Sequence, residues 1–200
     1  MNKLSTLFAM ALLVIATQVS AKISINKAAP DFSATTASGK TVKLSDYRGK
    51  QVILEWTNAD CPFVKKHYSS DNMQALQKKY TEQGVVWLSV ISSAKGKQGH
   101  VTAAQANKLT DSRSAMPSEV LLDATGSIGT AYSAKTTPHM YIIDEKGMLR
   151  YMGAIDSVRS TNPADIAKSV NYVDKAMTEL ASGKQVSEPI TQAYGCSVKY

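Results

Sequence analysis

Two cysteines, Cys61 and Cys196, are the residues of this chain whose chemistry stands out. Cys61 follows an apolar segment, residues 51–56, that has the pattern of a buried strand, and Pro62 directly after it suits the first turn of a helix. A thiol at a helix N-terminus has a lowered pKa, because the free N–H groups and the helix dipole favour the thiolate. The thiolate is the form that attacks a disulfide or a peroxide. The position of Cys61 therefore predicts a reactive nucleophile, against the alternative of a buried and inert cysteine.

Cys196 lies near the end of the chain, in residues 183–200, beyond the last predicted helix. A thiol on a mobile terminal segment can reach a distant nucleophile and resolve its sulfenic acid or mixed disulfide. The alternative is a structural Cys61–Cys196 disulfide, which the chain-entropy model credits with about 5 kcal/mol for so long a loop. We favour the resolving role, and the sequence leaves both possibilities open.

The segments around the cysteines alternate between strand and helix patterns. Apolar runs predict strands at residues 51–56, 85–91, 120–123, 140–144 and 148–152, the last two forming a hairpin across Glu145-Lys146-Gly147. Helical spacing predicts one helix from just after Cys61 to Gly84, a second at 101–113, a short segment near 128–132 and a last helix from Asn162-Pro163 to about Ser182. This order predicts an α/β sandwich around a mixed sheet.

Several of these segments together resemble a known family. They are Ala29-Pro30-Asp31-Phe32, Gly39-Lys40, residues 44–50, Leu54-Glu55-Trp56 and residues 137–147. Residues 28–153 resemble the redoxin domains of alkyl hydroperoxide reductases, thiol-specific antioxidant proteins (AhpC/TSA) and periplasmic thioredoxin-like reductases. The resemblance is closest to a peroxiredoxin-like subgroup with Cys-Pro-Phe-Val at the helix start and a Gly-Cys-Ser-Val-Lys-Tyr tail.

The resemblance implies a thioredoxin-like sandwich, a mixed β-sheet flanked by helices. It also implies that Thr137-Pro138, placed before the hairpin, is a cis-proline loop packed against the catalytic thiol of Cys61. Pro138 then shapes the substrate groove, and Thr137 offers backbone hydrogen bonds to an extended partner. We accordingly expect catalytic roles for Cys61, Cys196, Thr137 and Pro138.

The chain also departs from the motifs of the family that it resembles. A thioredoxin-type Cys-x-x-Cys needs a cysteine where this chain has Val64, so a local dithiol cycle is excluded. The proline and threonine of the peroxiredoxin motif are replaced by Leu54 and Asn58. Its helper arginine has no clear counterpart, and Arg113 and Arg150 are no more than candidates. Thiol chemistry is expected, while the sequence leaves peroxide and disulfide open as substrates.

A second class of function stays open beside the enzyme. Cys61, His67 and His139 are candidates for a copper or zinc site. His67 is more typical of a solvated or helix-face histidine, and for His139 a role as a neighbour that tunes Cys61 stays equally open. The chain is then a non-catalytic thioredoxin-fold module that binds copper or a partner protein and holds a structural Cys61–Cys196 disulfide. Our first expectation is a thiol oxidoreductase recycled by an external thiol reductant protein, without a bound cofactor or metal.

The N-terminus and the overall charge indicate where such a protein works. Lys3, the apolar run to Ala16 and the small residues before Lys22 predict a signal peptide at residues 1–21, and hence an exported protein, periplasmic or secreted. A redoxin domain at residues 22–182 and a C-terminal tail at 183–200 follow. The net charge of +7 is spread without a basic block, so we expect no nucleic-acid partner and no membrane association after signal cleavage.

Overall fold

The computed structural model describes residues 23–200 of the chain. The predicted signal peptide, residues 1–21, lies outside the described residues. Within residues 23–200, no helix combines the length and apolar character needed to cross a membrane.

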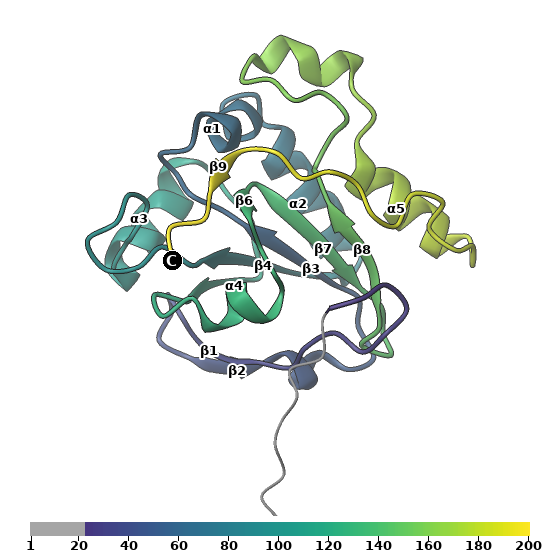
Figure 1. The fold of residues 1–200 in the computed structure, drawn as a ribbon, viewed down its shortest axis with the longest axis horizontal. Helices are drawn as coiled ribbons and strands as arrows, with labels where there is room; N and C mark the ends of the chain where they lie inside the picture. Colours follow the sequence, from purple (N-terminus) through teal and green to yellow (C-terminus); the bar gives the residue numbers. More distant parts are fainter. Residues whose placement is uncertain (1–22) are drawn as a thin grey trace, which may run out of the picture.

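A mixed β-sheet forms the centre of the described part, residues 23–200 (Figure 1). Its seven strands follow the order β2 (Thr41–Lys43), β1 (Ser33–Thr36), β5 (Glu119–Leu122), β4 (Val86–Ile91), β3 (Val52–Trp56), β7 (His139–Ile143) and β8 (Leu149–Gly153). The strands β3, β4 and β5 run parallel, whereas β7 and β8 form the predicted antiparallel hairpin beside β3. The α/β sandwich with a mixed sheet, as predicted from the sequence, is confirmed.

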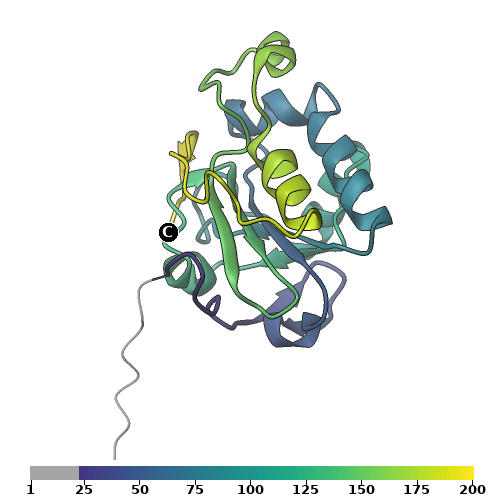
Figure 2. The same cartoon turned by 90° about the vertical axis from the view of Figure 1, so that its right-hand side faces the viewer.

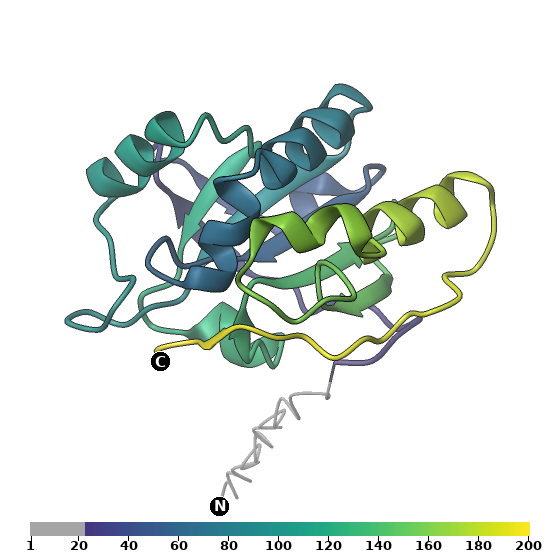
Figure 3. The same ribbon diagram turned by 90° about the horizontal axis from the view of Figure 1, so that it is seen from above.

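Helices cover both faces of this sheet. They are α1 (Pro62–Tyr68), α2 (Asn72–Glu82), α3 (Ala103–Ser112), α4 (Ser127–Ala131) and α5 (Tyr172–Ala181), with 3-10 turns at Leu44–Tyr47 and Pro163–Lys168. Neighbouring β3 residues point to opposite faces: Ile53 joins the core under α1, α2 and α5, and Leu54 joins the core on the α4 side. Figures 2 and 3 show α2 (blue) and α5 (yellow-green) side by side on the first face.

Two of the predicted helices are interrupted. The predicted helix after Cys61 is in fact two, because Asp71 adopts a left-handed φ of 58° between α1 and α2. The predicted last helix begins only at Tyr172: residues 163–168 form a 3-10 turn instead, and Val170, placed on the apolar face by its spacing, is exposed. Helical spacing alone did not reveal either break, since the apolar residues continue across both.

The end of the chain forms a strap, residues 189–200, that runs across the sheet edge (yellow in Figures 1 and 3). The backbone N–H of Met152 in β8 donates to Pro189 O at 3.0 Å. Further along, Val198 N–H donates to Lys135 O at 3.0 Å. The sequence suggested a mobile tail here, and the structure shows a docked one instead, because its backbone finds partners in distant segments.

Candidate active site at Cys61 and Cys196

Cys61 lies at the N-cap of α1, at the end of the loop that follows β3. The loop is held by Asn58, whose side-chain oxygen accepts from Asp60 N–H at 2.9 Å and whose carbonyl accepts from Cys61 N–H at 3.1 Å. Pro62 takes the first helical position, where a missing N–H costs no hydrogen bond. The sequence thus places the thiol at the junction of strand and helix, and the Cys61 side chain is fully buried there.

The Thr137-Pro138 loop lies against this thiol. The peptide bond between Thr137 and Pro138 is cis, and Cys61 Sγ donates a hydrogen bond to Thr137 O at 3.1 Å. Thr137 is buried, and its hydroxyl has no hydrogen-bond partner among the described residues. Cys61, Thr137 and Pro138 therefore meet in the structure.

Cys196 reaches the same peptide from the other side. The short strand β9 (Cys196–Ser197) of the strap pairs antiparallel with β6 (Thr136–Thr137), and Cys196 stands opposite Thr137. The residue before it, Gly195, has a φ of 140°, and a Cβ there would lie 2.0 Å from Thr137 O. Only glycine allows the strap to lie this close. Both thiols are consequently gathered around a single peptide group.

The pKa values of the two thiols are shifted in opposite directions. Burial raises the pKa of Cys61, but hydrogen bonds from the Cys196 thiol and from the N–H groups of Val64 and Cys196 outweigh it, so the pKa is lowered on balance. Burial and then the neighbouring Cys61 raise the pKa of Cys196 to about 11, against a small lowering by Lys199. The arrangement favours loss of the proton from Cys61 before Cys196. On ionisation Cys61 gives up its hydrogen bond to Thr137 O and accepts one from the protonated Cys196. Both side chains are free thiols in this structure, and Cys196 is the more exposed.

The extended groove expected at Thr137 is occupied by the chain itself. The sequence predicted that Thr137 offers backbone hydrogen bonds to an extended partner, and the strap pairs with that strand edge. The arginine candidates lie elsewhere: the Arg113 guanidinium sits 4.1 Å from the centre of the Tyr68 ring, and Arg150 pairs with Asp144 at 2.7 Å. Neither of these contacts brings an arginine to Cys61.

The histidines are engaged away from the Cys61 thiol. His139 Nδ1 lies 3.1 Å from the Tyr141 hydroxyl, and burial lowers the pKa of His139 to about 4. His67 Nδ1 contacts the Asn72 amide at 2.9 Å, and burial lowers its pKa to about 4 as well. Within residues 23–200, no three His, Cys, Asp or Glu side chains are grouped to hold a metal ion.

A buried charged cluster beside the site escaped sequence reasoning. Lys66 of α1 is fully buried and pairs with buried Asp156 at 2.9 Å, and Tyr194 of the strap contacts both. The only local signal was that this lysine lies midway between the buried positions Val64 and Tyr68, two residues from each. Because its carboxylate partner is 90 residues away in the sequence, spacing could not reveal the pair.

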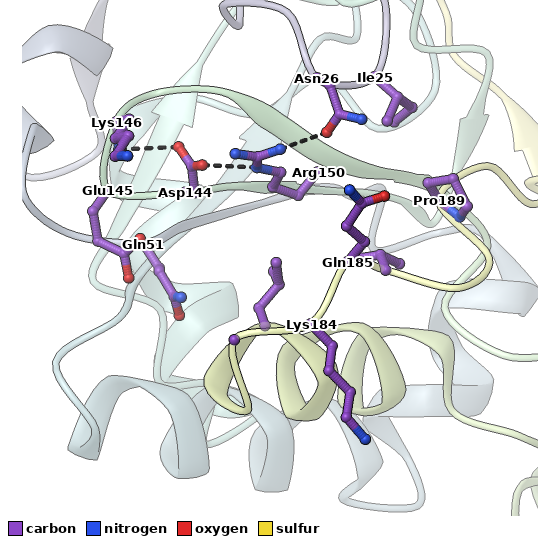
Figure 4. Close-up of a pocket in the computed structure, with 13 residues that line it drawn as sticks. Ile25, Asn26, Gln51, Asp144, Glu145, Lys146, Arg150, Lys184, Gln185 and Pro189 are labelled. Carbon is purple, nitrogen blue, oxygen red and sulfur yellow. Dashed lines mark hydrogen bonds and ion pairs between the residues drawn. The ribbon is translucent and has the colours of Figure 1, made fainter.

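A hollow in the described part of the surface lies at the far end of the sheet from the thiols. It measures about 470 Å³ and is lined by residues including Asp144, Arg150 and Lys184 (Figure 4). β3 and β7 run antiparallel, so Ile143 stands opposite Val52 at the start of β3, whereas Cys61 follows its end. This hollow therefore takes no part in the thiol site.

Comparison with known protein families agrees with the fold. Residues 25–152 match the model of the AhpC/TSA family. The chain belongs to this family. The match covers more than half of the chain and includes Cys61, Thr137 and Pro138, and it ends before the strap that carries Cys196.

Individual relatives are thioredoxin-like proteins. The chain is 33% identical to thioredoxin-like protein YneN of Bacillus subtilis over 61% of its own length and 66% of that protein. It is 29% identical to thiol-disulfide oxidoreductase ResA of Bacillus thuringiensis, over 63% of this chain and 67% of the relative. It thus matches about two thirds of the length of these relatives.

A solved structure extends the likeness beyond the family match. An uncharacterized conserved protein of Geobacillus kaustophilus superposes with a TM-score of 0.77 at 25% identity, covering 88% of this chain and 92% of the other. The fold is thioredoxin-like, and the chain is similar to thiol-disulfide oxidoreductases of that fold.

Proposed function

We propose that this protein is an exported thiol oxidoreductase in which Cys61 is the nucleophile and Cys196 the resolving thiol. One observation carries the proposal: both thiols meet at the Thr137 peptide, one with a lowered and one with a raised pKa. This is the arrangement that a two-thiol cycle requires, because the thiolate reacts first and the protonated thiol waits beside it.

The first step takes place at Cys61 Sγ. With a disulfide R–S–S–R′, the thiolate forms Cys61–S–S–R and releases R′–S⁻. With a hydroperoxide ROOH, it forms the sulfenic acid Cys61–SOH and releases RO⁻, which takes up a proton as ROH. A hydroperoxide is reduced by two electrons in this step, whereas the two-electron reduction of a disulfide is complete only when the second step releases R–S⁻.

The second step joins the two cysteines. Cys196 loses its proton and attacks Cys61 Sγ, which gives the Cys61–Cys196 disulfide and releases R–S⁻ or, from the sulfenic acid, water. Cys196 stands opposite Thr137, the residue that contacts Cys61, so both thiols begin this step at the same peptide group.

The third step returns the protein to its reduced form and needs an external thiol. The thiol attacks Cys196 Sγ, because Cys196 is the more exposed of the two sulfurs and because Cys61, with its lower pKa, is the better leaving group. A second thiol then releases Cys196 and forms the reductant's disulfide. We propose a thiol reductant protein in this role, and a hydroperoxide or a disulfide as substrate.

The experiment that tests the proposal measures the reactivity of Cys61. The thiolate absorbance of the reduced protein gives its pKa, and stopped-flow mixing gives its rates with hydrogen peroxide and with a small disulfide, beside Cys61→Ser and Cys196→Ser. We expect a pKa below about 8.5 and rates above those of a free thiol. An ordinary pKa with free-thiol rates would refute the enzyme.

A second candidate is a non-catalytic binding module with a structural Cys61–Cys196 disulfide. The complete burial of Cys61 favours it, since buried structural cysteines are inert. The reduction potential separates the two candidates, because structural disulfides have potentials below about −300 mV. We expect a higher potential than this, as a cycling pair requires.

Export of the protein is proposed from residues 1–21 and from thiol chemistry that suits an oxidising compartment. The mass of the protein recovered outside the cytoplasm tests it: cleavage leaves Lys22 as the first residue, and an uncleaved chain confined to the cytoplasm would overturn it.

A further inference from the structure

The buried cluster of Lys66, Asp156 and Tyr194 has no part in the steps described above. Lys66 Nζ lies 2.9 Å from Asp156 Oδ2 and 3.0 Å from the Val158 carbonyl oxygen, with both charged side chains almost fully buried. Asp156 Oδ1 accepts from Val158 N–H at 3.0 Å. A buried ion pair is stable only when further hydrogen bonds satisfy its remaining donors and acceptors.

Tyr194 supplies one of these hydrogen bonds and belongs to the strap. Its hydroxyl donates to Asp156 Oδ1 and lies 3.5 Å from Lys66 Nζ. Its ring packs edge-on against Phe63, with 5.7 Å between the ring centres. Tyr194 is buried, although the residues before it in the strap are more exposed. This side chain therefore fastens the strap to the body of the protein two residues before Cys196.

The helix α1 contacts the strap through Tyr194 and also begins at the Cys61 thiol. Cys61 caps α1, whose residues Phe63 and Lys66 hold Tyr194. Gly195 and Cys196 follow immediately and lie along Thr137, which accepts a hydrogen bond from Cys61. The chain from Tyr194 to Cys196 thus connects a contact on the side of α1 to the Thr137 peptide at its N-terminus.

We propose that Tyr194, held by Asp156 and Lys66, is a positioning residue that sets the placement of Cys196 against Cys61 and so the efficiency of disulfide formation between them. This inference rests on the proposed function. The buried ion pair then has a role in the reaction, because Lys66 holds the Asp156 carboxylate in place as the acceptor for the Tyr194 hydroxyl. This placement also accounts for the glycine after Tyr194, since the strap must lie flat on Thr137 within one residue of its anchor.

The effective concentration of Cys196 toward Cys61 measures this placement. In a buffer of reduced and oxidised glutathione, it is the ratio of the Cys61–Cys196 disulfide to the Cys61–glutathione mixed disulfide, multiplied by the concentration of reduced glutathione. Acid quenching and mass spectrometry of the full-length mature protein give this ratio.

Tyr194→Phe removes the hydroxyl and keeps the ring on Phe63. We expect the effective concentration to fall about tenfold, the effect of losing one hydrogen bond to a charged group. The thiolate absorbance reports a second change: the pKa of Cys61 rises, because a displaced Cys196 no longer donates to it. Tyr80→Phe is the matched control, since the Tyr80 hydroxyl donates to Asp174 at 2.7 Å between α2 and α5. It should leave both quantities unchanged.

Two outcomes would overturn the role of Tyr194: a Tyr194→Phe protein with the effective concentration of the unmodified protein, or a fall of equal size in Tyr80→Phe. Either of these leaves the proposed function standing. If the unmodified protein forms no Cys61–Cys196 disulfide in the glutathione buffer, the resolving role itself fails, and the positioning role fails with it.

Discussion

Replacing Gly195 by alanine tests whether Cys196 is held against the Thr137 peptide. With the φ of 140° at this position, the new Cβ would lie 2.0 Å from Thr137 O and 2.7 Å from Thr137 C. A normal contact between non-bonded heavy atoms needs about 3.5 Å. The atoms in the way belong to the backbone of β6 and cannot turn aside as a flexible side chain could, so the strap has to move away.

The cost of this substitution follows from the backbone conformation and the clash. A non-glycine residue held in so rare a conformation costs about 1–3 kcal/mol. Undocking of the strap from β6 relieves this strain, so the docked state is less stable by the same free energy. The ratio of docked to undocked protein then falls by a factor of about 5 to 150. We expect the effective concentration of Cys196 toward Cys61 to fall by a factor in this range.

The glutathione equilibrium described above is the assay, and Gly183→Ala is its control. Gly183 also has a left-handed φ, 70°, and lies in the same C-terminal region, but a Cβ there meets nothing within 4 Å. That variant therefore carries backbone strain without a clash at the site. Equal effective concentrations in Gly195→Ala, Gly183→Ala and the unmodified protein would refute the placement of Cys196 beside Thr137.

Three further substitutions or conditions have defined outcomes. Cys196→Ala raises the pKa of Cys61, because it removes the thiol that donates to Cys61, whereas Cys196→Ser keeps a donor and has the smaller effect on the thiolate absorbance. Lys66→Met leaves its buried carboxylate partner uncompensated and lowers the free energy of unfolding in urea by about 3–5 kcal/mol, while Lys65→Met at an exposed position changes it little. Lowering the pH from about 6.5 to about 4 destabilises the fold by up to about 3 kcal/mol through His67. The folded pKa of His67, about 4, lies below its ordinary value, so the unfolded chain binds the proton first as the pH falls. His67→Gln should reduce this slope, and an unchanged slope would contradict the burial of a neutral imidazole.

The position of Cys61 could be predicted because its signals are local. The apolar run of β3 and the proline after the cysteine lie within about ten residues of one another, and each has a direct physical meaning. The cis-proline loop at Thr137 was available only through the family resemblance, since most X-Pro bonds are trans.

The docked strap and the buried ion pair could not be predicted, because their partners are distant in the sequence. Tyr194 lies 38 residues from Asp156, and Lys66 lies 90 residues from it. A lone lysine on a helix is normally solvent-exposed, and a polar tail without helical spacing is normally mobile. Only the folded protein shows that the Tyr194 hydroxyl of the strap donates to Asp156 and that the buried ion pair in turn holds the strap.

The break between α1 and α2 is also hidden in the sequence. The run from Val64 to Tyr80 keeps its apolar spacing through the break at Asp71, so periodicity alone gives one helix. The Ser70 hydroxyl donates to Lys66 O at 2.8 Å, which satisfies a carbonyl at the end of α1 and stabilises the break. The break turns the chain so that α1 lies at the thiol site and α2 packs on the sheet.

The most direct test of the account is whether Cys61 and Cys196 form one disulfide that cycles. The reduced protein is mixed with one equivalent of hydrogen peroxide or of a small disulfide, and non-reduced peptides are mapped by mass spectrometry over time, before and after a thiol reductant is added. The account predicts a Cys61–Cys196 linkage that appears quickly and is reversed by the reductant, and a Cys61 adduct that persists in Cys196→Ser. The account is contradicted if no linkage joins Cys61 to Cys196, or if a linkage forms that the reductant does not open.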